Sequence, residues 1–181
     1  FKKKLASFSV GEPVTVNGPF GKFTLDEDVA KQNVFLSGGI GITPFRSMLK
    51  FATDQKLPHK IVLLYSNKTP DDIVFKEDLV NFAKTNPNLT IINTITRPLD
   101  RSTTSNDASN EAMKQLNNDA SWLWETGRIN DVLIKKYVND LQNAIFYICG
   151  PPSMVEELLT TVKNMGVSEE NIKTVRFTGY R

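Results

Sequence analysis

The amino-acid sequence predicts an α/β fold built on a doubly wound parallel sheet. From Asn33 onward, short apolar runs alternate with segments whose apolar residues recur at helical spacing. Strands are expected at 34–36, 61–65, 91–95, 145–148 and 172–178, and helices at 45–52, 73–83 and 154–165. Strands that are apolar throughout and are joined by helices indicate a parallel sheet with both faces covered.

The first of these strands ends in a glycine-rich turn, Gly38-Gly39-Ile40-Gly41-Ile42-Thr43-Pro44. We expect its glycines to let a ligand approach the backbone, Thr43 to cap the following helix, and Pro44 to take the first helical position. The free amides of that helix's first turn would then suit a phosphate group. The third glycine of the Gly-x-Gly-x-x-Gly fingerprint is missing, so the turn also fits a plain connection without a ligand.

A second glycine turn follows the strand at 145–148. Here Cys149-Gly150-Pro151-Pro152 precedes a helical apolar face that starts at Met154, and Gly166 can close that helix. In open α/β sheets, ligands bind outside the carboxyl ends of the strands. The two turns are therefore predicted to hold opposite ends of one elongated ligand.

Composition narrows the class of protein without naming a function. The chain has 181 residues, of which 40% are hydrophobic, and a formal net charge of +2, so a sizeable core is expected and nucleic-acid binding is not. No apolar stretch spans a bilayer and no signal peptide is visible, which favours a cytoplasmic setting. The single cysteine excludes an internal disulfide and a Cys-ligated iron–sulfur cluster, and no metal site is predicted. The sole His59 is expected on a surface turn.

Seven motifs, taken together, resemble the nicotinamide-dinucleotide lobe of the ferredoxin–NADP reductase family. They are Gly18-Pro19-Phe20-Gly21, 38–44, Leu64-Tyr65-Ser66-Asn67, Thr96-Arg97-Pro98, Gly127-Arg128-Ile129, 149–152 and Phe177-Thr178-Gly179-Tyr180. The resemblance implies an FAD-dependent enzyme that moves hydride from NADH or NADPH to flavin. It also implies a redox partner, such as an iron–sulfur protein, a haem or an oxygenase.

The resemblance assigns roles to individual residues. Cys149 and Phe177 would lie near the nicotinamide and the flavin, although Cys149 also fits a small core residue and Phe177 an edge strand. The proposed cofactor-binding residues are Gly38, Gly39, Gly41, Ile42, Thr43, Pro44, Asn67, Arg97, Gly150, Pro151, Pro152, Met154 and Tyr180.

Coenzyme choice depends on the residues after the second and third strands. Arg97 could bind a ribose 2′-phosphate or stack on adenine, or pair on the surface with Asp100, and Lys68 is a second possible cation. No acidic residue directly ends the second strand to claim a 2′-hydroxyl, which favours NADPH over NADH.

The start of the chain is expected to belong to a different lobe. Residues 1–28 resemble the last strands of a flavin-binding β-barrel, with strands at 13–16 and 23–25, and 29–181 form the NAD(P)-binding domain. The family's upstream flavin motif is absent, so we interpret the chain as a truncated reductase that is inactive alone. Two other classes stay open: a regulatory or assembly module without turnover, and an enzyme acting on a phosphorylated small molecule at residues 38–44.

Overall fold

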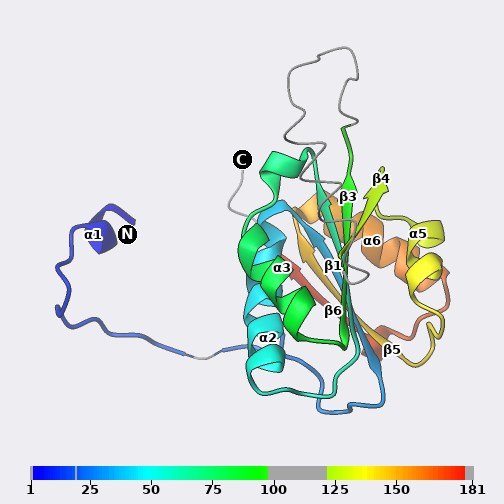
Figure 1. Cartoon of the computed structure of the whole chain (residues 1–181), viewed down its shortest axis with the longest axis horizontal. Coiled ribbons are helices and arrows are strands. Elements are labelled where there is room, and N and C mark those ends of the chain that lie inside the picture. The colour runs from blue at the N-terminus through cyan, green and yellow to red at the C-terminus, as the bar shows by residue number, and fades with distance from the viewer. Residues whose placement is uncertain (1, 19, 98–121, 178–181) are drawn as a thin grey trace.

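The computed structural model describes residues 2–18, 20–97 and 122–177, which form a six-stranded sheet with helices on both faces (Figure 1). All neighbouring strands are parallel, and their order is β4-β3-β2-β1-β5-β6. The strands are β1 (Gln32–Gly38), β2 (Ile61–Asn67), β3 (Leu89–Ile95), β4 (Trp122–Thr126), β5 (Ala144–Gly150) and β6 (Ile172–Arg176). The predicted doubly wound parallel α/β fold is thereby confirmed, and the last strand ends two residues earlier than expected.

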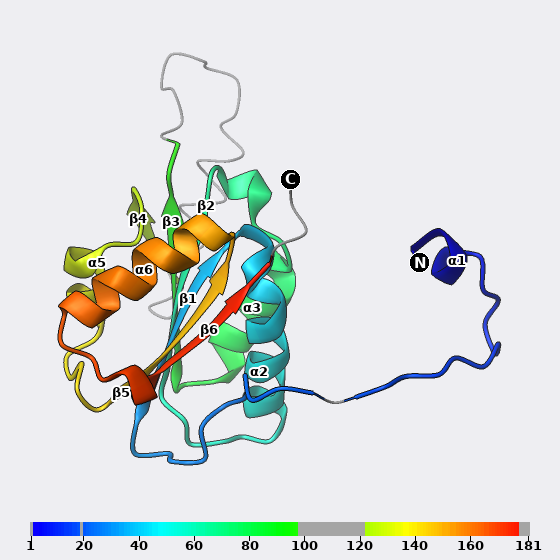
Figure 2. The same cartoon turned by 180° about the vertical axis from the view of Figure 1, so that it is seen from behind.

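Two pairs of helices cover the sheet. On one face, α2 (Ile42–Asp54) and α3 (Lys76–Thr85) pack on a core of Phe35, Leu63 and Ile91. On the other face lie α5 (Asp131–Tyr137) and α6 (Pro152–Asn164), as Figure 2 shows from behind. α2, α3 and α6 bury residues at spacings of three and four, such as Val155, Leu158 and Val162 in α6, because this spacing places them on one side of the helix.

Short 3₁₀ turns join several elements. They are η1 (Gly39–Gly41), η2 (Pro70–Asp72) and η3 (Glu169–Asn171). The helix predicted over 73–83 starts later in the structure, because α3 begins only after Phe75, whose φ is 57°. A left-handed residue cannot continue a helix, so Ile73 and Phe75 lie in the connection between η2 and α3.

The beginning of the chain differs from the prediction. Residues 2–18 and 20–31 contain one short helix, α1 (Lys2–Ala6), and no strand, so the strands expected at 13–16 and 23–25 are absent. Figure 1 shows this segment extending away from the sheet with α1 at its far end. A strand needs a neighbouring strand for its backbone hydrogen bonds, and residues 13–16 lie exposed without one. Assignment of 1–28 to a flavin-binding lobe stays a prediction.

The segment is fixed to the sheet at Phe23 and Asp26. The Phe23 ring packs against Phe45 and Tyr147, with ring centroids 5.7 and 5.6 Å apart. The Asp26 amide donates to the Tyr147 hydroxyl at 2.9 Å, and its carboxylate accepts from Lys173 Nζ at 3.1 Å. His59 is buried here rather than on a surface turn, because its Nε2 lies 2.9 Å from the Asp26 carbonyl oxygen.

Candidate functional site

A cavity of about 250 Å³ opens where the two glycine turns meet. It is lined by Gly38, Gly39, Ile40, Pro151, Pro152 and Phe177. The turns follow β1 and β5, which pair with each other, and the chain crosses from β1 toward β2 on one side and from β5 toward β6 on the other. This is the topological switch point of the sheet, where helices diverge and leave room for a ligand.

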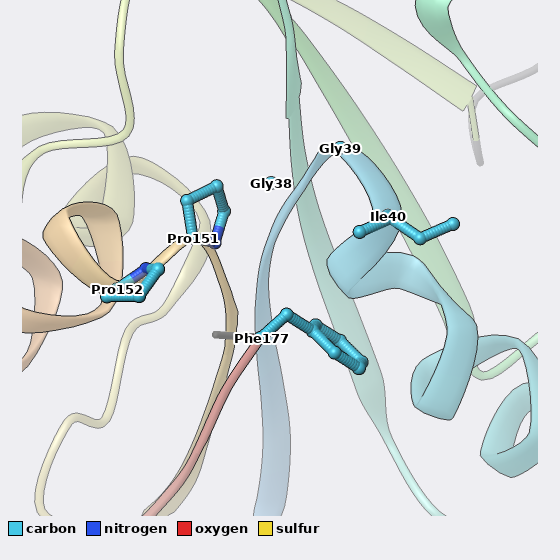
Figure 3. Close-up of a pocket in the computed structure, with 6 residues that line it drawn as sticks. All are labelled: Gly38, Gly39, Ile40, Pro151, Pro152 and Phe177. Carbon is cyan, nitrogen blue, oxygen red and sulfur yellow. The ribbon is translucent and has the colours of Figure 1, made fainter. Parts of the chain in front are cut away.

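Figure 3 shows how the cavity residues lie. Pro151 stands beside Gly38, while Gly39 forms the crest of the first turn and Ile40 projects from its far side. The Phe177 ring extends from the end of β6 toward the side on which Ile40 lies. The structure thus brings five of the predicted site residues together, and their binding roles stay predictions. Ile40 was not predicted, although its position between two glycines was a signal.

The helix after the first turn begins differently from the prediction. Gly41, not Thr43, is the residue before α2, and Pro44 is the third helical residue rather than the first. The Thr43 hydroxyl donates to the Ile40 carbonyl at 2.8 Å, so it does not accept from a backbone amide as an N-cap would. The reason is η1, which starts helical geometry three residues before Ile42. The Ile42 side chain itself is fully buried in the core.

Packing between the two turns requires a glycine at position 41. A Cβ on Gly41 would lie 2.6 Å from the Cys149 carbonyl carbon and 2.8 Å from Gly150 Cα, and closer still to the Cys149 carbonyl oxygen. These are backbone atoms of β5, which cannot swing aside. β5 therefore occupies the space that a side chain at position 41 would need, and the predicted role of Gly41 in cofactor binding stays a prediction.

Gly39 has the properties expected of a ligand-facing glycine. Its φ is 51°, and no heavy atom of the described part of the chain lies within 4 Å of an added Cβ. Left-handed geometry favours glycine at this position, and its backbone borders the cavity.

Met154 ties the two turns together. A Cβ on Gly38 would stand 3.0 Å from Met154 Cε and nearer to its sulfur, and a Cβ on Gly150 would meet the sulfur at 3.4 Å. The thioether therefore fills the space that a side chain at Gly38 would need and lies at contact distance from a Cβ at Gly150. Met154 does not line the cavity.

Cys149 faces the α2 side of the sheet and has no exposed surface. Burial raises the pKa of its thiol to about 12, so the group is a neutral thiol at physiological pH. It does not line the cavity, and its contact with nicotinamide stays a prediction.

Phe177 follows β6 rather than lying within it. Its amide donates to the Gly150 carbonyl at 3.1 Å, and its side chain packs on the same core face as Cys149. The aromatic ring is therefore held at the mouth of the second glycine turn. Tyr180, also predicted at the site, lies outside the described residues.

The loops after β2 and β3 form a charged corner at the same edge of the sheet. The Arg97 amide donates to the Lys68 carbonyl at 3.0 Å, which fixes the two loops together. Asp72 accepts from the Thr69 amide and hydroxyl at 2.9 and 2.8 Å. These hydrogen bonds, with the positive charges of Lys68 and Arg97, hold the pKa of Asp72 below its ordinary value.

Asp72 brings a carboxylate to this corner, although no acidic residue directly ends β2. It lies five residues past the end of β2, at the last position of η2. Asn67, predicted to bind the cofactor, is buried, and neither polar atom of its side-chain amide has a hydrogen-bond partner among the described residues. Its binding role also stays a prediction.

Tyr65 contacts the first glycine turn, although the sequence analysis named it only as part of the motif at residues 64–67. It is fully buried on β2, and its hydroxyl donates to the Gly39 carbonyl at 3.0 Å. Burial raises its pKa to about 12, so the hydroxyl keeps its proton. A tyrosine inside an otherwise aliphatic strand, Ile61-Val62-Leu63-Leu64-Tyr65, was the available signal.

Comparison with known proteins places the chain in a family. The profile of the oxidoreductase NAD-binding domain matches residues 35–159. Among curated proteins, one subunit of the Na(+)-translocating NADH-quinone reductase of Klebsiella pneumoniae is 31% identical over 178 residues, which cover 96% of this chain and 39% of that protein. Its counterpart in Idiomarina loihiensis is 30% identical over 181 residues, again 96% and 39%. The chain thus spans about two fifths of the length of these relatives.

Solved structures share the fold at low sequence identity. The Amycolatopsis cytochrome P450 reductase GcoB matches with a TM-score of 0.67 and 20% identity, covering 88% of this chain and 42% of that one. The ferredoxin-NADP+ reductase of Plasmodium falciparum matches at 0.56 and 21%, covering 87% and 58%. Among the described residues, no helix is long and apolar enough to cross a membrane. With its strand order, its two glycine turns and a profile match over most of its length, the chain belongs to the oxidoreductase NAD-binding domain family.

Proposed function

We propose that this chain is the NAD(P)H-binding lobe of a flavin-dependent oxidoreductase, which transfers hydride from NAD(P)H to FAD and passes electrons to a protein acceptor. The observation that carries the proposal is the cavity between two glycine turns at the switch point of the sheet. Its walls are backbone and proline rings on one side and an aromatic ring on the other, which suits a flat ring joined to phosphates.

The residues present fit a dinucleotide along the carboxyl edge of the sheet. The first amides of η1 have no partner within it, and in α6, where Pro151 and Pro152 carry no N–H, the first free amides are those of Ser153 and Met154; these amides can donate to a diphosphate. The Pro151 and Phe177 side would hold the nicotinamide, and the corner of Asn67 and Arg97 would hold the adenosine. When bound, the nicotinamide supplies the hydride, and the protein's part is to orient it and exclude water.

Cys149 and Phe177 are proposed to position the nicotinamide ring. Both side chains lie on the α2 face of the sheet, and Phe177 already borders the cavity. Because Cys149 is fully buried, a side chain on that face must move before the thiol can touch a ligand. Its contribution would be steric, since its high pKa and the absence of a neighbouring base among the described residues give no nucleophile.

Relatives support the flavin and the acceptor. The curated relatives are named as components of NADH-quinone reductases, and one fold neighbour is a flavohemoglobin from Malassezia yamatoensis with bound FAD and heme. We propose an iron–sulfur protein, a haem or an oxygenase as the acceptor, and a cytoplasmic setting. A flavin lobe that includes residues 1–28 would bury the apolar side chains Val10, Val16 and Phe20, which are at least 80% exposed.

Two measurements test the proposal. Isothermal titration of NADH and NADPH into the chain should give saturable binding with a one-to-one ratio, and absence of binding to either would contradict the assignment of the cavity. Stopped-flow absorbance on the full-length gene product should show flavin reduction by NAD(P)H. A full-length protein that binds dinucleotide but holds no flavin would instead support the regulatory or assembly module.

A further inference from the structure

The peptide between Gly39 and Ile40 is held from inside the sheet. The Gly39 carbonyl accepts from the Tyr65 hydroxyl at 3.0 Å and also from the Ile42 amide at the end of η1. A peptide unit is planar and trans, so its N–H points opposite to its C=O. With the Gly39 carbonyl directed inward at Tyr65, the Ile40 N–H is directed outward, away from the core.

This N–H is suited to meet a ligand. Gly39 and Ile40 both line the cavity, and the first amides of a helical segment have no partner within it. A glycine at φ 51° has no Cβ, and the flexibility of such a residue makes its flanking peptides easy to rotate. Without an interior anchor, the 39–40 peptide could turn its carbonyl outward and present a negative dipole to an anionic ligand.

Tyr65 is an anchor that cannot shift. It lies at the centre of the sheet, in register with Ser37 on β1 and Asn93 on β3, and its side chain is fully buried. Gly39 offers its hydroxyl an acceptor, and a buried hydroxyl without one would be costly. The bond therefore stabilises both the tyrosine and the peptide orientation.

We propose that Tyr65 is a positioning residue for dinucleotide binding, which holds the 39–40 peptide so that the Ile40 N–H points at the diphosphate of the ligand. The proposal rests on the proposed function for its ligand, but the peptide orientation it describes can be measured without one. Tyr65 has no exposed surface and touches the ligand only through the peptide that it orients.

The test compares Tyr65→Phe with Tyr147→Phe. Tyr147 is a second fully buried tyrosine on the same face of the sheet, and its hydroxyl bonds to Asp26 and Lys173 instead of the turn. Each change removes one hydroxyl and one set of core hydrogen bonds, so both variants should lose similar stability in thermal melts. Tyr65→Phe should weaken NADH binding about fivefold, the effect of one ordinary hydrogen bond, and Tyr147→Phe less than about twofold.

Nuclear magnetic resonance of the Ile40 amide distinguishes a positioning role of Tyr65 from a general contribution to stability. In the parent, titration with inorganic pyrophosphate should shift the Ile40 amide signal, and in Tyr65→Phe that shift should be lost while amides of the second turn still respond. The residual dipolar coupling of the Ile40 N–H, measured without ligand, should also change in Tyr65→Phe alone. An unchanged coupling would overturn the role of Tyr65, whereas a parent that binds no dinucleotide would overturn the proposed function.

Discussion

Replacing Gly41 with alanine should destabilise the fold, whereas the same change at Gly39 should spare it. The Gly41 methyl would stand 2.6 Å from the Cys149 carbonyl carbon, where ordinary contact begins at 3.4 Å. To restore that contact, η1 and β5 must separate by about 1 Å, in a core whose packing leaves no room for such a shift. Overpacking typically costs 1–3 kcal/mol, and with backbone on both sides we expect about 3 kcal/mol.

At Gly39 the added methyl meets no atom of residues 2–18, 20–97 or 122–177 within 4 Å, so the left-handed backbone geometry is what opposes it. The expected cost is about 1 kcal/mol of unfolding free energy. Gly127→Ala is the matched control, since its φ is 94° and its Cβ also has open space, but it lies outside the cavity.

Urea denaturation followed by circular dichroism measures all three free energies, and calorimetry measures NADH affinity. Gly39→Ala should lose affinity at a stability close to that of Gly127→Ala, because only Gly39 borders the cavity. If Gly41→Ala unfolded within about 0.5 kcal/mol of the parent, the packing argument for that glycine would be refuted. If Gly39→Ala bound NADH as the parent does, the first turn would not be the phosphate site.

The remaining predictions concern coenzyme choice, pH and the thiol. Arg97→Ala should weaken NADPH binding more than NADH binding, by about fivefold as expected of one solvent-screened charge contact. Asp72→Asn should shift preference toward NADPH, because it removes a negative charge near Arg97 that would repel a 2′-phosphate. Equal changes for both coenzymes in calorimetry would exclude a 2′-phosphate role. Asp26→Asn should cost about 0.5 kcal/mol at neutral pH through loss of the Lys173 pair. Partial burial alone would raise the Asp26 pKa, but the Asp28 amide and Lys173 lower it from 3.8, so this stability is present above pH 3.8 and is lost as pH falls through the lower folded value; denaturation midpoints that differ equally at pH 7 and pH 2.5 would contradict this. The Cys149 thiol should resist modification by a thiol reagent such as iodoacetamide until the chain unfolds, since it is buried with a pKa of about 12, and fast labelling of the native chain would show that it is accessible.

The elements that were predicted correctly from the sequence are those whose sequence pattern lies within a short stretch of the chain. The apolar strands, the helix α6 that is followed by the left-handed Gly166, and the two glycine turns each carry their pattern within a few residues, and the structure has them in place. The parallel sheet then brings the turns together, because the carboxyl ends of all strands share one edge.

The missed features depend on contacts between residues distant in sequence. Gly41 is constrained by β5, which lies more than a hundred residues away, and Asp26 meets Tyr147 and Lys173 across similar separations. No local pattern distinguishes a glycine that faces a ligand from one pressed against another strand. The strands expected near the start failed for a related reason, since strand-like composition forms no strand without a partner to pair with.

The Met154 thioether, wedged against Gly38 and Gly150, gives the site a constraint that acts on its evolution. A larger residue at position 38 can be accommodated only if the residue at position 154 becomes smaller, because the two side chains would occupy the same space. If the two positions changed one at a time, the intermediate protein would be either overpacked or left with a cavity between the two turns. Substitutions at Gly38 and Met154 should therefore occur together in evolution, although the two residues are far apart in the sequence.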